Sequence, residues 1–177
     1  MTSLKKIYLK KTREKSVLNR HPWVYSGAID RIDPGIEDGD MVSLRDFQGA
    51  TLGTGYYNSS SRIRVRLLSF GGASVDREFL RTLVSRAVTY RQLNPLLKNT
   101  TACRLINGEG DGLPGLVVDQ YDRHLAIQLS TRGIERIRDI ILEFLIERCK
   151  PDSVYERSCL LYTSDAADEE DSVDLGG

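Results

Sequence analysis

The sequence predicts an α+β protein with a small β-barrel, then a connecting helix, then an incomplete ββαβ domain. Three observations support this order. Short β-rich runs separated by turns fill residues 1–74, a helix-period apolar repeat begins at Asp76, and a glycine-rich loop joins two apolar runs between Arg104 and Tyr121. We therefore expect one domain over residues 1–74 and a second over residues 75–158.

Composition is that of an ordinary globular chain, since 40% of the 177 residues are hydrophobic and 28% are charged. No apolar run reaches the roughly 18 residues that a membrane helix needs, and no secretory signal opens the chain. We therefore expect a cytoplasmic protein without a membrane partner. The cysteines at 103, 149 and 159 form no CxxC motif, so neither a disulfide framework nor a metal site is predicted.

Residues 159–177 differ from the rest of the chain in charge and pattern. They hold six acids and no base, which leaves 25 bases against 19 acids in residues 1–158. An acidic segment without periodicity is typical of a disordered tail. Its first six residues also permit the codons TGT CTC TTA TAC ACA TCT, which resemble the transposon end used in sequencing libraries. We interpret residues 159–177 as an adapter-derived artefact, and expect a fragment whose native frame ends near Ser158.

The first domain is predicted to hold short strands around one short helix. Ile7–Leu9 is β-rich, and Thr12 is placed to cap a helix that ends at Pro22. Trp23–Ile32 is again β-rich, and Met41–Leu44 alternates after turns rich in Asp and Gly. Short strands at this spacing favour a small barrel.

The run Arg62–Leu67 shows the clearest alternation of charged and apolar residues in the chain. Period two places Ile63, Val65 and Leu67 on the core face and the arginines at 62, 64 and 66 on the other. Further basic residues flank the short helix: Lys10, Lys11, Arg13, Lys15 and Arg20. From the residues alone, a solvated charged face and a phosphate-binding surface both remain open.

The second domain begins with a helix that Asp76 caps and that stops at Asn94-Pro95. Its apolar stripe is Phe79, Leu80, Leu83, Val84, Ala87, Val88 and Tyr90. Strand, tight loop and strand follow at Arg104–Tyr121, and a third strand at Leu125–Leu129. One amphipathic helix then runs to Lys150-Pro151, and a last strand starts at Ser153. We expect this incomplete domain to have an exposed sheet edge and reduced stability.

The glycine-rich loop, residues 107–112, is not predicted to bind phosphate or calcium. A phosphate loop needs a helix N-terminus after the glycines, whereas Pro114-Gly115 and a β-rich run follow, and Glu109 and Asp111 would repel an anion. A calcium loop needs a glutamate at its twelfth position, which is Val118 when counted from Asn107.

Two runs carry a resemblance to a known family: REKSVLNRHPWVYSGAI at Arg13–Ile29 and RLINGEGDGLPGLVVDQY at Arg104–Tyr121. Both resemble the N-terminal part of the bacterial 23S rRNA cytosine-5 methyltransferases, which join a PUA domain to a class I methyltransferase domain. The similarity covers Ile7 to about Ser158. It implies a PUA-like barrel that binds 23S ribosomal RNA around its first helix and an adjacent strand. Whether the parent protein is a homodimer stays open.

The resemblance makes the basic residues of the first domain candidates for binding RNA. His21 and Trp23 either stack on a base or sugar, or serve the fold, with Trp23 beneath the barrel and His21 in a turn. The candidate RNA-binding residues are Lys10, Lys11, Arg13, Lys15, Arg20, His21, Arg62, Arg64 and Arg66.

No catalytic or cofactor residue is predicted. Cytosine-5 methylation needs a reactive thiolate, but Cys103 and Cys149 lack a neighbouring cation and are predicted to be inert. The resemblance places the catalytic and S-adenosylmethionine sites of the full-length parent outside this chain. We expect the RNA-recognition half of a methyltransferase. The alternatives are a stand-alone, non-enzymatic PUA-type RNA-binding protein and an interaction module without a nucleic-acid partner.

Overall fold

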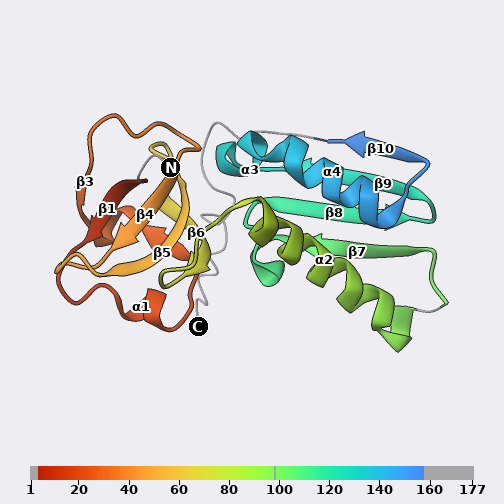
Figure 1. The fold of residues 1–177 in the computed structure, drawn as a ribbon, viewed down its shortest axis with the longest axis horizontal. Helices are drawn as coiled ribbons and strands as arrows, with labels where there is room; N and C mark the ends of the chain where they lie inside the picture. The colour runs from red at the N-terminus through yellow and green to blue at the C-terminus, as the bar shows by residue number, and fades with distance from the viewer. Residues whose placement is uncertain (1–3, 98, 158–177) are drawn as a thin grey trace, which may run out of the picture.

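Six strands of the first part of the chain pair into one curled sheet in the computed structural model, which describes residues 4–97 and 99–157 (Figure 1). We call residues 4–74 the barrel region and residues 75–157 the second region. The predicted tail, residues 159–177, lies outside the described residues. The elements of the barrel region are β1 (Lys5–Leu9), α1 (Lys15–Leu18), β2 (Trp23–Tyr25), the 3-10 helix η1 (Ser26–Ala28), β3 (Ile29–Ile32), β4 (Met41–Arg45), β5 (Thr51–Tyr57) and β6 (Ile63–Phe70).

The sheet order is β2-β6-β5-β4-β1-β3, with β1 and β4 parallel and the other neighbours antiparallel. Because β2 and β3 lie at its two edges, the described sheet is a half-barrel rather than a closed barrel. The core face of β6 is as predicted, since Ile63, Val65 and Leu67 are each at most 2% exposed. Gly55 lets β5 and β6 cross closely, because a Cβ there would lie 2.1 Å from the Arg66 carbonyl oxygen.

The prediction that Thr12 caps the first helix is wrong. Thr12 adopts a left-handed backbone with φ of +68°, and α1 starts three residues later behind Glu14, which makes no side-chain cap bond. The chain turns at Thr12, where the Arg13 amide donates to the Lys10 carbonyl at 3.1 Å. The residues that we predicted to start the helix therefore form this turn instead.

The second region is a four-stranded sheet of order β10-β9-β8-β7, with β10 parallel to β9. In Figure 1, α2 and α4 lie over one face of this sheet. Its elements are α2 (Arg77–Leu93), η2 (Pro95–Leu97), β7 (Ala102–Asn107), η3 (Gly108–Asp111), β8 (Leu116–Tyr121), β9 (His124–Leu129), α3 (Arg132–Arg136), α4 (Arg138–Cys149) and β10 (Ser153–Glu156). The α+β class is confirmed. After the connecting helix α2, three strands precede α3 and α4, so this part has one more strand before its helices than the predicted ββαβ.

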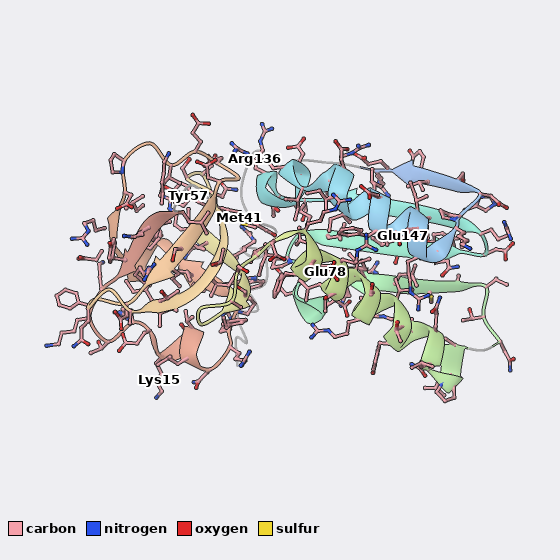
Figure 2. The ribbon with its side chains drawn as sticks, in the orientation of Figure 1. Lys15, Met41, Tyr57, Glu78, Arg136 and Glu147 are labelled. Atoms are coloured by element: carbon pink, nitrogen blue, oxygen red, sulfur yellow. The ribbon has the colours of Figure 1, made fainter. Side chains whose placement is uncertain are left out.

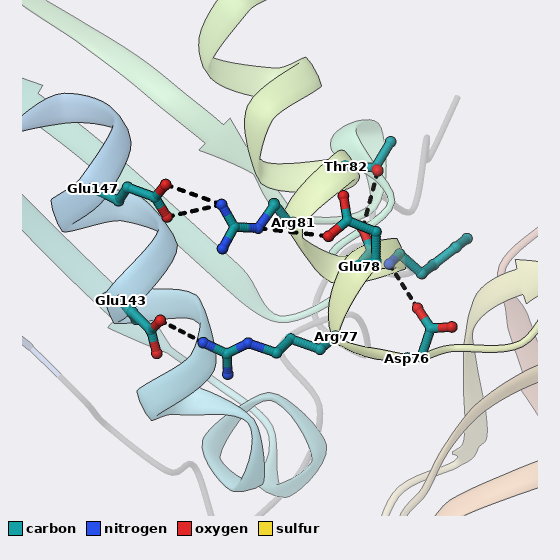
Figure 3. A network of polar contacts seen from close by, with 8 residues as sticks. Asp76, Arg77, Glu78, Arg81, Thr82, Glu143 and Glu147 are labelled. Carbon is teal, nitrogen blue, oxygen red and sulfur yellow. Dashed lines mark hydrogen bonds and ion pairs between the residues drawn. The ribbon is translucent and has the colours of Figure 1, made fainter.

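The helix predictions of this region are partly confirmed. Asp76 caps α2 by accepting a hydrogen bond from the Phe79 amide at 2.8 Å. Tyr90 does not belong to the buried stripe, because it is 67% exposed. The single helix predicted before Lys150 is two helices, because the backbone leaves helical geometry at Ile137. Ion pairs from Arg77 and Arg81 of α2 to carboxylates of α4 join the two long helices (Figure 3).

Tyr56 joins the barrel region to the second region. Its side chain is 2% exposed and packs in the apolar core of the second region, and its hydroxyl donates to the Pro114 carbonyl. Burial raises the pKa of this hydroxyl well above its usual range, so the donor keeps its proton. Nearby, Arg136 at the barrel-facing end of α3 pairs with Asp40 at 2.6 Å (Figure 2). We call this set of contacts the seam.

Candidate nucleic-acid interface

Exposed cations surround α1, which lies at the lower edge of the barrel region in Figure 1. Figure 2 shows Lys15 pointing outward from α1. Lys10 directly follows β1, and its ammonium group donates to the Gly27 carbonyl at 3.0 Å. The cations, which we call the α1 cluster, are Lys10, Lys11, Arg13, Lys15 and Arg20.

No member of the α1 cluster forms an ion pair within the part of the chain that the structure describes. Eight arginines of the second region do form such pairs: Arg77, Arg81, Arg91, Arg104, Arg123, Arg132, Arg136 and Arg138. Unpaired surface cations at close spacing release counterions when they meet phosphates, and this release favours binding to a polyanion. The α1 cluster therefore has the electrostatics of a phosphate-binding surface.

The arginines at 62, 64 and 66, just before and within β6, are not equally exposed. Arg62 is exposed, and Arg64 is half-buried with its guanidinium 3.5 Å from the Asn58 carbonyl. Arg66 is only 7% exposed because it lies in register between Trp23 of β2 and Tyr56 of β5. It donates to the Ile63 carbonyl at 3.3 Å. The prediction that β6 displays three open arginines is therefore wrong at Arg66.

Trp23 faces the seam, a position that neither sequence interpretation gave. Its indole Nε1 donates to Glu109 Oε1 of η3 at 2.9 Å, and the side chain is half-buried. His21 is exposed in the turn before β2, as one of the two interpretations placed it. Its Nδ1 accepts the Trp23 amide at 3.2 Å, and the two rings meet edge to face at 5.7 Å. Trp23 thus anchors the turn that carries His21 to the second region.

Tyr25 is an exposed aromatic residue that the sequence analysis did not single out. It is 48% exposed on the edge strand β2, while its neighbour Val24 is 3% exposed. The Ser26 amide donates to the Arg62 carbonyl at 2.8 Å, so Tyr25 lies beside Arg62. The alternation of Trp23-Val24-Tyr25 would have placed this ring on the outer face. An exposed ring beside cations can stack on a base while the cations bind phosphates.

The cysteines offer no catalytic nucleophile among the described residues. Burial raises the pKa of the Cys103 thiol and of the Cys149 thiol, so both stay protonated at neutral pH. Within residues 4–97 and 99–157, no three His, Cys, Asp or Glu side chains gather in a way that could hold a metal ion. In the same residues, no helix is long and apolar enough to cross a membrane.

Comparisons with known proteins find a domain family for the barrel region and relatives for most of the chain. Residues 7–70 match the family model described as a PUA-like domain. The chain is 38% identical over 154 residues to the ribosomal RNA large subunit methyltransferase I of Aliivibrio fischeri strain MJ11, and 38% identical over 155 residues to that of Erwinia tasmaniensis. Each match covers 86% of this chain and 39% of the relative, so the chain spans about two fifths of the relatives' length.

A solved structure from Streptococcus mutans, described as a SAM-dependent methyltransferase, superposes with a TM-score of 0.74 at 22% identity. The match covers 86% of this chain and 40% of that one. At this identity the likeness concerns the fold. Residues 7–70 therefore match a PUA-like domain, and the chain shares its fold with part of the protein described as a methyltransferase.

Proposed function

We propose that this chain is the RNA-recognition half of a methyltransferase that uses S-adenosylmethionine to modify carbon 5 of a cytosine in 23S ribosomal RNA in the cytoplasm. The observation that carries the proposal is the α1 cluster, which is five exposed cations without ion pairs among the described residues, on a PUA-like domain. The names of the relatives support ribosomal RNA as the polyanion and methyl transfer as the activity.

The proposal divides the work between binding and chemistry. Residues 1–74 bind RNA, and residues 75–158 form a second domain that holds the first in place through the seam. The methyl transfer and the S-adenosylmethionine site belong to the part of the relatives' length that lies outside the match. The protonated thiols of Cys103 and Cys149 support this division, because cytosine-5 methylation needs a thiolate.

A binding measurement with the whole 177-residue chain tests RNA recognition. Fluorescence anisotropy with a labelled 23S rRNA fragment at several salt concentrations should give an affinity that falls steeply with salt. The contact residues proposed for this binding are the α1 cluster with His21, Arg62 and Arg64, and we add Tyr25; the buried Arg66 is left out. Binding that ignores salt, or no binding, would contradict the proposal and favour an interaction module without a nucleic-acid partner.

A chimera separates the methyltransferase part from a stand-alone RNA-binding protein. Residues 1–157 would replace the matched segment of the Aliivibrio relative, and bisulfite sequencing would read cytosine-5 methylation of 23S rRNA. Methylation by the chimera but not by the isolated chain is the expected result. A chimera that binds RNA as tightly as the relative does, yet leaves the RNA unmethylated, would favour the stand-alone interpretation.

A further inference from the structure

A pocket lined by charged residues lies in the second region beside η3. It has a volume of about 380 Å³, which is in the range of small-ligand sites. The pocket sits between α2 and the end of the β7 strand. The residues that line it are Arg86, Ala87, Tyr90, Arg91, Asn107, Gly110 and Asp111.

The pocket carries one net positive charge. The Arg91 guanidinium donates two hydrogen bonds to the Asp111 carboxylate, at 2.6 Å and 2.7 Å. The backbone amide of Asn107 donates to the same carboxylate at 2.7 Å. Asp111 is therefore neutralised and already accepts three hydrogen bonds. Arg86 is exposed, and its guanidinium has neither an ion pair nor a hydrogen bond among the described residues. An anion that enters the pocket would meet Arg86 without competition from Asp111.

The same pocket holds an exposed ring and an amide. Tyr90 is 67% exposed, and the Arg91 guanidinium lies 5.4 Å from the centre of its ring. A ring in this setting can stack on a nucleobase. Asn107 is exposed in the wall of the pocket, and its carboxamide can both donate to and accept from a base edge. A free guanidinium, a stacking ring and an amide together match a nucleotide: phosphate, base face and base edge.

A series of contacts links the pocket to the α1 cluster, although the two lie in different regions. Gly110 directly follows Glu109, whose carboxylate accepts the Trp23 indole at 2.9 Å. The centres of the His21 and Trp23 rings are 5.7 Å apart, and Arg20 directly precedes His21 in the chain. Contacts thus run from the end of α1 through Trp23 and Glu109 to the pocket. A strand bound on the α1 cluster can continue across the seam.

We infer that this pocket binds one nucleotide of a single-stranded segment of the RNA that the α1 cluster holds, with its phosphate on Arg86 and its base on Tyr90. The inference rests on the proposed function, because it assigns a second contact to the same RNA. It also gives the second region a direct part in recognition, beyond holding the barrel region in place.

Binding of a labelled single-stranded RNA to the full chain and two pocket variants tests the inference. Arg86→Gln should lower the slope of log affinity against log salt by about 0.7, the contribution of one single-strand phosphate. Tyr90→Ala should weaken binding about fivefold or more at unchanged slope, because one base loses its stacking partner. Matched controls are Arg81→Gln on the same helix, where the arginine pairs with Glu147, and Tyr121→Ala, a residue 56% exposed on β8.

The outcomes separate this inference from the proposed function. If the pocket variants bind RNA like the parent chain while binding stays salt-dependent, the pocket assignment is wrong and the proposed function stands. If the parent chain binds no RNA, both fail. If a nucleoside monophosphate binds with dependence on Arg86 and Tyr90 while RNA binding ignores them, the pocket is a free-nucleotide site and the inference is overturned. Unchanged thermal midpoints would show that the variants are folded.

Discussion

The two regions of this chain use their cations differently. In the barrel region, the five members of the α1 cluster are exposed and form no ion pair with any described residue. In the second region, eight arginines meet carboxylates, and the Arg91–Asp111 pair is mostly buried, with side chains 16% and 12% exposed. Charge that is neutralised inside the fold is not available to a polyanion. The presence or absence of ion pairs is therefore a better guide to the RNA-binding surface than the number of cations in each region.

Burial also ranks the pairs of the second region. The α2–α4 pair of Arg77 and Glu143 has side chains that are 51% and 56% exposed, and water screens such open pairs so that they add little to stability. The Arg91–Asp111 pair is far less open to water and fixes η3 against α2. We therefore expect stability to depend on Asp111, and RNA affinity to depend on the α1 cluster. Four predictions test this division of roles.

The largest expected effect comes from separating the two regions at the seam. Gly133→Ala would place a Cβ 2.0 Å from Cγ of the buried Tyr56 ring, so one side must move. We expect a loss of about 3 kcal/mol in the free energy of unfolding, measured by urea denaturation. Gly27→Ala is the control, because nothing lies within 4 Å of the added Cβ. Equal unfolding free energies of the two variants would show that the Tyr56 ring can move at little cost. The contact between the two regions would then contribute little to stability.

Asp111→Asn should have the next largest effect. The substitution removes the charge that holds Arg91 and leaves a guanidinium facing an amide in a poorly hydrated site. We expect a loss of about 2 kcal/mol in unfolding free energy. Asp119→Asn makes the same chemical change in the Arg104–Asp119 pair, whose side chains are 52% and 26% exposed, and should cost less than about 1 kcal/mol. A reversed order would contradict the ranking by burial.

Neutralising cations in each region compares their roles directly. The double variant Lys11→Gln/Lys15→Gln should lower the salt slope of RNA binding by about 1.5, because two phosphate contacts are lost. Unfolding free energy should stay the same, since neither side chain has an ion pair among the described residues. The readouts are anisotropy at several salt concentrations and urea denaturation.

The matched control is Arg123→Gln/Arg138→Gln, which removes the same two charges from the second region. Both arginines are paired there, Arg123 with Asp152 and Arg138 with Glu156. The salt slope of this variant should stay close to that of the parent chain. If both double variants lower the slope equally, RNA responds to net charge alone, and the assignment to the α1 cluster fails.

Much of the fold could be predicted because local patterns specify it. Alternation in β6 identified Ile63, Val65 and Leu67 as core residues, and Asp76 was found as a helix cap. Patterns within one segment failed where a distant segment decides the outcome. Arg66 is buried by β2 and β5 on either side of its strand, and Trp23 bonds to Glu109 of the other region. No spacing in the sequence encodes those contacts.

The candidate site was predicted less completely than the fold. The cations around α1 are exposed, as the sequence suggested, because a four-residue helix on the outside of the sheet leaves little room to bury them. The lack of an ion pair at Arg86 among the described residues could not be predicted, because it depends on Asp111 being paired with Arg91 instead. Tyr25 was within reach of the alternation rule but was not singled out. Charge pairing in three dimensions therefore decides which cations are free.

The smallest expected effect concerns the thiols, and it tests whether the second region is free of catalytic chemistry. Burial raises the pKa of Cys103 and Cys149, so at pH 7.5 each holds less thiolate than an ordinary cysteine, whose pKa is about 8.5. In a Cys159→Ser background, iodoacetamide should modify both more slowly than free cysteine, and the rate should still climb above pH 9. Rapid modification near pH 7 would reveal an activated thiolate, and the second region would then have to be considered as a contributor to the proposed methyl transfer.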